Sequence, residues 1–122
     1  MKTGFDRVRR LARDLAGTEE STSWGSPSLK LRGRMFACIA VHSSAEPNTL
    51  VVCIPIEQRD ELIAADSHTF YLTDHYVNYP SLLVRLSRVR DDALGDLLLA
   101  AWKFAAELGP PKTRRPTRRA RR

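Results

Sequence analysis

Apolar side chains recur at helical spacing near both ends of this 122-residue chain. The first repeat spans residues 3–17, with Thr3 placed to cap a helix and Gly17 placed to end it. The second spans residues 91–108, and Gly109 with the prolines after it stops the helix. Its apolar stripe comprises Leu94, Leu97, Leu98, Ala101, Trp102, Ala105 and Leu108. The pattern predicts two amphipathic helices that each bury one face.

Between these helices the apolar pattern has the shorter period of β-strands. Residues 29–31 alternate between leucine and lysine, Gly33 follows, and residues 35–41 are almost continuously apolar. This predicts a hairpin with its tip at Arg32–Gly33 and a second strand that is buried on both faces, hence central in a sheet. The rest of the pattern predicts a polar connector over 18–27, strands over 49–54, 69–72 and 82–86, a short helix over 57–65 and an irregular segment over 74–81.

The order of these elements predicts the fold class. Neighbouring strands joined by short turns pair in antiparallel fashion. The N-terminal and C-terminal helices can then lie together on one face of the sheet, which gives an α+β two-layer sandwich. We expect residues 1–109 to form this domain, because a chain of this length buries a core without disulfides or a metal.

The positive charge is concentrated at the C-terminus. The formal net charge is +6, but no acidic residue follows Gly109. Seven basic residues follow it: Lys112, Arg114, Arg115, Arg118, Arg119, Arg121 and Arg122. Residues 1–109 therefore carry 13 basic and 14 acidic side chains, a net charge of −1. We expect residues 110–122 to be a disordered basic tail, since proline, threonine and arginine cannot build a core.

The sequence contains no recognisable catalytic or metal-binding pattern. Cys38 and Cys53 lie in apolar runs and are interpreted as buried, reduced core residues. His42, His68 and His75 lack the spacing of a ligand set, so neither a metal nor a cofactor is expected, and the chain is interpreted as non-enzymatic. A signal peptide and a membrane span of roughly 18 apolar residues are both missing. We expect a cytoplasmic protein without a membrane partner, monomeric by default.

Two segments resemble a known family. The first reads Ser23-Trp24-Gly25-Ser26-Pro27-Ser28 and leads into the glycine-tipped hairpin at Gly33, and the second reads Asp96-Leu97-Leu98-Leu99-Ala100-Ala101-Trp102. On these motifs nearly all of residues 1–109 is similar to the MmcQ/YjbR family. The motif residues expected to have structural roles are Trp24, Gly25, Pro27, Gly33 and Trp102.

The resemblance implies a frataxin-like (CyaY-like) α+β sandwich. The family is usually described as DNA-binding, on the basis of a two-winged fold rather than of any chemistry. This chain departs from the family in two places. It has Tyr79-Pro80-Ser81-Leu82 where many members have a tryptophan before the late strand, and its arginine-rich tail lies outside the family pattern.

Nucleic acid, either DNA or RNA, is the partner that the residues favour. In the folded part, Lys30, Arg32 and Arg34 form a basic hairpin that could reach phosphates. The tail arginines 114, 115, 118, 119, 121 and 122 would add affinity that is blind to sequence. The competing interpretation of the hairpin is a solvated strand whose charges prevent edge pairing. That of the tail is a solvated segment that only keeps the protein in solution.

Aromatic residues support an alternative function. The favoured interpretation of Trp24 is an anchor of the polar connector in the core, and the competing one is a platform on which a base or ring stacks. If the chain is instead a module that binds a protein or a small ligand, a pocket or apolar patch should lie beside Tyr71, Tyr76 and Tyr79.

Overall fold

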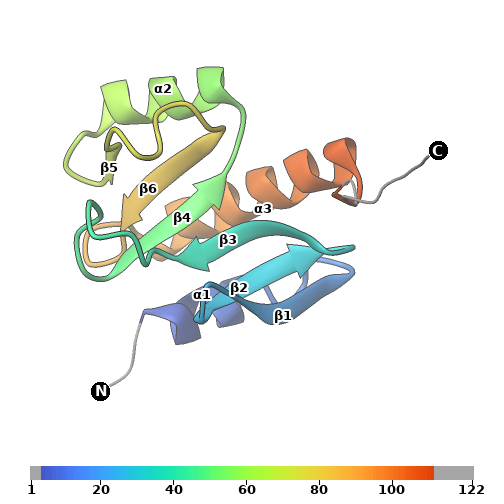
Figure 1. Cartoon of the computed structure of the whole chain (residues 1–122). Coiled ribbons are helices and arrows are strands. Elements are labelled where there is room, and N and C mark those ends of the chain that lie inside the picture. Colours follow the sequence, from blue (N-terminus) through green and yellow to red (C-terminus); the bar gives the residue numbers. More distant parts are fainter. Residues whose placement is uncertain (1–3, 112–122) are drawn as a thin grey trace.

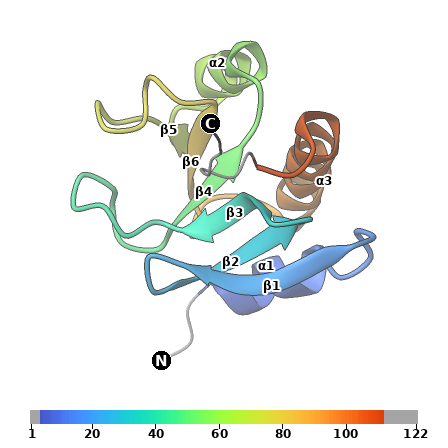
Figure 2. The same cartoon turned by 45° about the vertical axis from the view of Figure 1, so that its right-hand side comes forward.

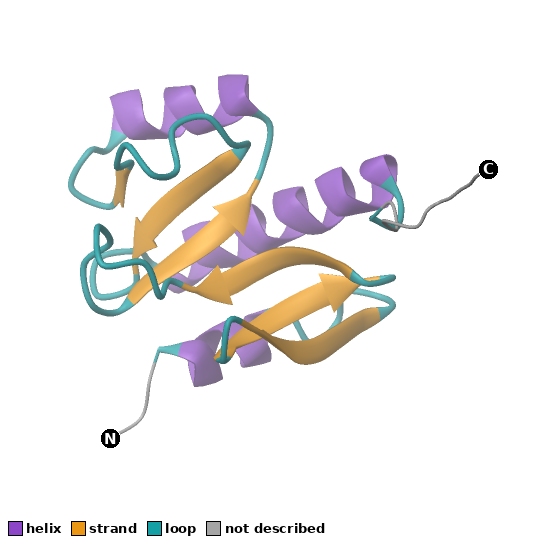
Figure 3. Cartoon of the chain, in the orientation of Figure 1, coloured by secondary structure: helices purple, strands orange, loops and turns teal. Residues whose placement is uncertain are grey.

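The computed structural model describes residues 4–111 of the chain, and within them six antiparallel strands form one sheet with three helices (Figures 1 and 3). The elements are α1 (Phe5–Leu11), β1 (Thr18–Ser23), β2 (Ser26–Leu31), β3 (Arg34–Ile39), β4 (Thr49–Cys53), α2 (Ile56–Ala65), β5 (Phe70–Tyr71), β6 (Ser81–Arg85) and α3 (Asp91–Leu108). The strand order is β1-β2-β3-β4-β6-β5. The predicted α+β class is confirmed, and β3 is central as expected.

Helices α1 and α3 lie together against one face of the sheet (Figure 2). Helix α2 contacts the strands β5 and β6 at the far edge. The two faces of the sheet are set by alternation along each strand. In β4, Leu50 and Val52 point to the helices, whereas Thr49, Val51 and Cys53 point to the opposite face.

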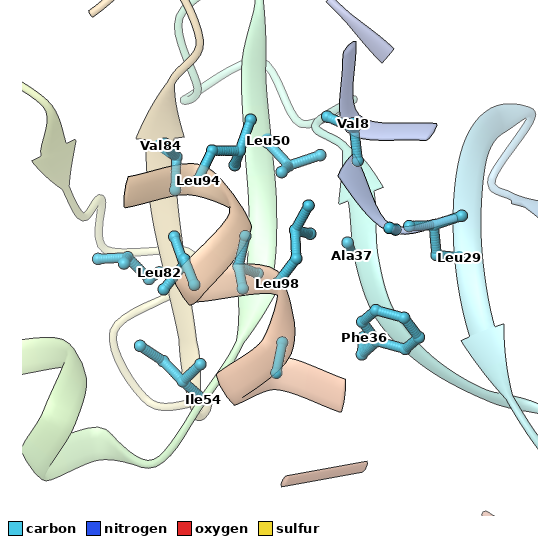
Figure 4. Packing of buried hydrophobic residues seen from close by; sticks show 14 of the residues in the cluster. Val8, Leu29, Phe36, Ala37, Leu50, Ile54, Leu82, Val84, Leu94 and Leu98 are labelled. Atoms are coloured by element: carbon cyan, nitrogen blue, oxygen red, sulfur yellow. The ribbon is translucent and has the colours of Figure 1, made fainter. Parts of the chain in front are cut away.

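The core lies between α3, α1 and the strands that they cover (Figure 4). Its largest fully buried side chains include Phe5, Phe36, Leu50, Leu82 and Leu98. Each buried side chain of this size stabilises the fold by about 1.5–3 kcal/mol relative to exposure. The stripe predicted for the last helix is confirmed for most of its length, although Leu108 at its end is exposed.

Residues 18–23 form an edge strand, so the predicted polar connector is wrong. Strand β1 pairs with β2 along its whole length, from Thr18 opposite Leu31 to Ser23 opposite Ser26. The two strands are joined by Trp24 and Gly25, with φ angles of 53° and 81°, which is the pattern of a type I′ turn. The strand is polar because it lies at the sheet edge. The periodicity of apolar residues therefore could not reveal it.

The core-anchor interpretation of Trp24 is also wrong. The turn between β1 and β2 places Trp24 at the end of a hairpin, where its side chain is 78% exposed. Trp102, the other tryptophan, is partly buried against the core, and its indole N–H donates to the carbonyl of Ala16 at 2.8 Å. The connector after α1 is therefore fixed by Trp102.

The first helix is shorter than predicted. It ends at Leu11, and residues 12–17 continue as turns, with Leu15 N–H bonded to the Ala12 carbonyl and Gly17 at φ 74°. The Ala16 carbonyl is used by Trp102, so the chain leaves the helical path there. The short helix predicted over 57–65 is present as α2, in which Leu62 and Ile63 are partly buried and Arg59 is the most buried residue.

We expect Leu98→Ala to lower the free energy of unfolding by about 2–5 kcal/mol, because it leaves a cavity between α3 and the sheet. Leu99→Ala is the matched control, since the neighbouring side chain is 38% exposed and should cost less than about 1 kcal/mol. Urea denaturation followed by circular dichroism measures both. Equal losses in the two variants would contradict the proposed packing of α3.

Candidate nucleic-acid interface

The structure separates the three basic residues predicted on the hairpin. Lys30 lies on the sheet face away from the helices, opposite Glu19 of β1. Arg32 is in the turn itself, with φ 52° followed by Gly33 at φ 83°, and its side chain is exposed. Arg34 points to the helical side, where its guanidinium Nε–H donates to the Gly109 carbonyl at 2.6 Å. The predicted tip at Arg32–Gly33 is thus confirmed, and Arg34 has a structural partner.

The bond from Arg34 joins the hairpin to the end of α3. Gly109, at the C-cap of α3, accepts this hydrogen bond, and the ring of Pro111 lies beside the hairpin tip. A Cβ added at Gly33 would lie 3.7 Å from Cδ of Pro111, which is an ordinary contact distance, so it is the positive φ of 83° and not this approach that favours glycine here. The described chain therefore ends next to the hairpin tip (Figure 1).

The predicted tail arginines, 114 to 122, lie outside the described residues, as does Lys112. The remaining charge is unevenly divided along the chain. Residues 1–34 contain eight basic and four acidic side chains, whereas residues 35–85 contain two basic and six acidic ones. The part of the sequence that forms the basic hairpin thus carries a net charge of +4.

All three arginines of α1 form ion pairs. Arg9 bonds to Glu20 of β1 at 2.8 Å and also pairs with Asp6, and it holds the pKa of the Glu20 carboxyl below its usual value. Arg7 and Arg10 both pair with Asp91 and lower the pKa of that carboxyl. Within residues 4–111, Lys30 and Arg32 are the hairpin cations that make neither an ion pair nor a side-chain hydrogen bond, so they are free to meet an external anion. Arg13, Arg88 and Lys103, elsewhere on the described chain, also lack an ion pair.

The histidines are held in protein contacts. The rings of His42 and His75 stack with centroids 3.6 Å apart, and Tyr76 packs edge-on against both. His68 lies within the turn over 67–69 with its side chain exposed, and only its backbone N–H bonds to Asp66. Among the described residues, no group of three or more histidine, cysteine or acidic side chains is placed to hold a metal ion.

The tyrosines divide between two environments. Tyr71 donates or accepts a hydrogen bond at 2.7 Å with the Thr49 hydroxyl, and its oxygen accepts the backbone N–H of Glu46. Tyr76 and Tyr79 line a cavity of about 280 Å³ on the face of the sheet away from α1 and α3. A ligand-binding module was predicted to have a pocket beside Tyr71, Tyr76 and Tyr79, and a pocket does lie beside Tyr76 and Tyr79.

Sequence reasoning missed Arg59, which holds the segment carrying these tyrosines. Its side chain is only 4% exposed, and its guanidinium donates to the carbonyls of Val77 at 3.1 Å and Tyr79 at 2.9 Å. A buried arginine needs such partners, because an unpaired buried charge is costly. A lone arginine among the acidic residues of a surface helix was the only signal in the sequence.

The two cysteines are free thiols on the same sheet face as this cavity. Burial raises the pKa of Cys38 to about 11, and burial, with a smaller contribution from Cys38, raises that of Cys53 to about 11. Both thiols are therefore protonated and uncharged at neutral pH. This agrees with the interpretation of unreactive thiols. Their predicted place in the core is wrong, because both lie on the sheet face away from the core and Cys53 is only partly buried.

Comparison with known proteins identifies the family. The sequence model of the YjbR family matches residues 13–104, which is most of the chain. This protein belongs to the YjbR family. Its structure is similar to the crystal structure of Deinococcus radiodurans protein DR2400, a protein with the family domain DUF419, at a TM-score of 0.68 and 22% sequence identity over 91% of each chain. No curated protein matches the sequence.

The predicted resemblance to MmcQ/YjbR is thus confirmed, and at 22% identity the DR2400 structure supports the fold alone. The glycine-tipped hairpin and most of α3 lie within residues 13–104, which the YjbR model matches. Gly109 and the basic segment lie after these residues. Within the described residues, no helix is long and apolar enough to cross a membrane.

We expect Arg34→Ala to lower the free energy of unfolding by about 1.5 kcal/mol, because a charge-assisted hydrogen bond to the end of α3 is lost. The control is Arg32→Asn, which removes the same charge and suits the positive φ of the turn. It should change stability by less than about 0.5 kcal/mol. Urea denaturation compares them, and an unchanged Arg34→Ala variant would show that the bond to Gly109 contributes nothing.

A second prediction concerns the thiols. A pKa of about 11 in place of 9.0 lowers the thiolate fraction at pH 8 roughly 100-fold. Iodoacetamide should therefore alkylate the folded protein about 100 times more slowly than a free cysteine, and urea should restore the ordinary rate. Mass spectrometry of timed samples measures this. Rapid alkylation of the folded protein would mean that the thiols are neither buried nor protonated.

Proposed function

We propose that this YjbR-family protein is a cytoplasmic, non-enzymatic nucleic-acid-binding protein that contacts the phosphates of DNA. The observation that supports this most is the bond between Arg34 and Gly109, together with the contact of Pro111 and Gly33. It attaches the segment with seven unbalanced cations at the tip of the basic hairpin, although the two are far apart in sequence. The segment that carries these cations therefore begins beside the hairpin tip.

The roles of the three hairpin residues follow from their contacts. Arg32 and Lys30, which have no ion pair within residues 4–111, would bind phosphates directly. Arg34 would act mainly as a positioning residue, because its Nε–H is used by Gly109. The arginines of the C-terminal segment would supply most of the affinity, through the release of counterions.

Counterion release makes the proposal quantitative. If the seven C-terminal cations engage duplex phosphates, the logarithm of affinity falls with the logarithm of salt at a slope of about −6. Adding Lys30 and Arg32 would bring the slope to about −8. The net charge of −1 on residues 1–109 means that the overall field of the folded part does not by itself attract DNA. Any contribution of residues 1–109 to DNA affinity must therefore come from the local charges of the hairpin.

A second candidate function is a module that binds a small ligand. The specific observation that favours it is the cavity beside Tyr76 and Tyr79. This function does not compete with the first for the same residues, since neither Lys30 nor Arg32 lines the cavity.

The proposal is tested by fluorescence anisotropy with a labelled DNA duplex, titrated at salt concentrations from about 50 to about 200 mM. The full chain, a chain ending at Gly109, and the full-chain variants Arg32→Asn and Arg88→Ala are compared. Arg88 is the charge-matched control. It is exposed and precedes the N-terminus of α3, an 18-residue helix that spans roughly 27 Å and ends at the hairpin tip.

We expect the full chain to bind with a slope near −8, Arg32→Asn to make the slope shallower by about one, and Arg88→Ala to leave it unchanged. Equal effects of the two substitutions would show that the hairpin makes no local contact. If the chain ending at Gly109 loses all binding while Arg32→Asn has no effect, the C-terminal segment acts as a general polycation. Absence of binding by the full chain at 50 mM salt would refute the proposal.

A further inference from the structure

The sheet face away from α1 and α3 carries a cavity of about 280 Å³. Its floor is made by side chains of the central strands, Cys38 from β3 and Val51 and Cys53 from β4, which alternation directs away from the core. Tyr76, Tyr79 and Pro80 form one side. Trp24 from the turn between β1 and β2 also lines it, so residues distant in sequence meet there.

The three most exposed large apolar side chains of the described residues line this cavity. Trp24 is 78% exposed, Tyr79 is 61% exposed and Val41 is 52% exposed, and all three line it. Solvating an indole ring at a hairpin tip gains nothing for the fold. Exposed aromatic groups beside a hollow are the usual mark of a binding site.

The cavity is electrically neutral. Within the described part of the chain, no lysine, arginine or carboxylate side chain lines it. The thiols of its floor are protonated, because burial raises the pKa of both to about 11. A charged group would lose its hydration against these uncharged side chains, which is costly. Lys30 lies on the same sheet face, opposite Met35, but does not itself line the cavity.

The walls are fixed before any ligand arrives. The guanidinium of Arg59 donates hydrogen bonds to the carbonyls of Val77 and Tyr79 and so fixes the segment that carries Tyr79. On the other side, the stacked rings of His42 and His75 join the two loops that border the cavity, and Ser44 bonds to Thr73 at 2.8 Å. A pre-formed site does not spend binding free energy on ordering its loops.

We propose that this cavity binds an uncharged aromatic compound of one or two rings with few hydrogen-bonding groups, with Trp24 stacking on it. The volume is near the lower end for small-molecule sites, which fits a compact ligand. Aromatic walls favour an aromatic ligand through offset or edge-on ring contacts. A nucleobase fits poorly, because the polar atoms of its edge would be buried without partners in an apolar site.

Protein NMR on the full chain tests the proposal, with naphthalene-2-methanol as the uncharged probe and 2-naphthoate as its charged counterpart. N-acetylphenylalaninamide stands in for the side chain of a peptide partner. The variant is Trp24→Asn, which removes the ring and suits the type I′ turn, because asparagine before glycine is favoured there. The control is Val77→Ala, which alters the same neighbourhood at a residue that does not line the cavity.

We expect saturable shifts of the amides of Val51, Cys53 and Tyr76 with naphthalene-2-methanol, and an affinity that does not change with salt. Trp24→Asn should raise Kd about three- to tenfold while Val77→Ala leaves it unchanged, and 2-naphthoate should bind at least about tenfold more weakly. The proposal is overturned if no saturable shift occurs at these amides, or if both variants behave alike. It is also overturned if naphthoate binds equally well, or if the phenylalanine amide binds more tightly, which would make a peptide the occupant.

Discussion

The packing of α3 on a single face of the sheet is the contact on which the rest of the structure depends. The 18-residue helix buries Leu94, Leu98 and Ala101 completely against the central strands. Since the sheet has two faces and α1 shares the same one, the opposite face is left without a helix. Strand β4 nevertheless places Val51 and Cys53 there, so that face is apolar at its centre. The segment from 72 to 80 covers part of it, and the uncovered part is the cavity.

The same helix also sets the position of the basic end. Helix α3 runs back along the sheet and ends where the β2–β3 hairpin turns, and there the Gly109 carbonyl meets the side chain of Arg34. A carbonyl at the C-terminus of a helix has no partner within the helix and carries a partial negative charge, so an arginine is a favourable donor. This contact places the end of the described chain, up to Pro111, beside Gly33 at the hairpin tip. The cavity and the basic tip are thus both consequences of how α3 lies.

The sequence predicted the elements whose signals are local. The positive φ angles of Arg32 and Gly33 belong to a two-residue turn, and the arginine–glycine pair between apolar runs predicted this turn. The apolar stripe announced α3. Strand β1 was missed because its six residues, Thr18–Ser23, are polar, and an edge strand needs no apolar face to be held in place by backbone pairing. Trp24 was misplaced for the same reason, since without β1 there was no turn to present it.

The contacts that build the two candidate sites depend on tertiary structure and left little trace in the sequence. Nothing local to Arg34 indicates a carbonyl 75 positions away, and nothing local to Arg59 indicates the carbonyls of Val77 and Tyr79. The hairpin arginines were grouped by their proximity in sequence, but alternation and the turn send them in different directions. Trp24 and Arg32 lie at the two ends of the six-residue strand β2, roughly 20 Å apart at about 3.3 Å per residue. A charged surface at one end and a neutral cavity at the other obey different physics, since salt screens only the first. The two proposed functions can therefore be tested independently of each other.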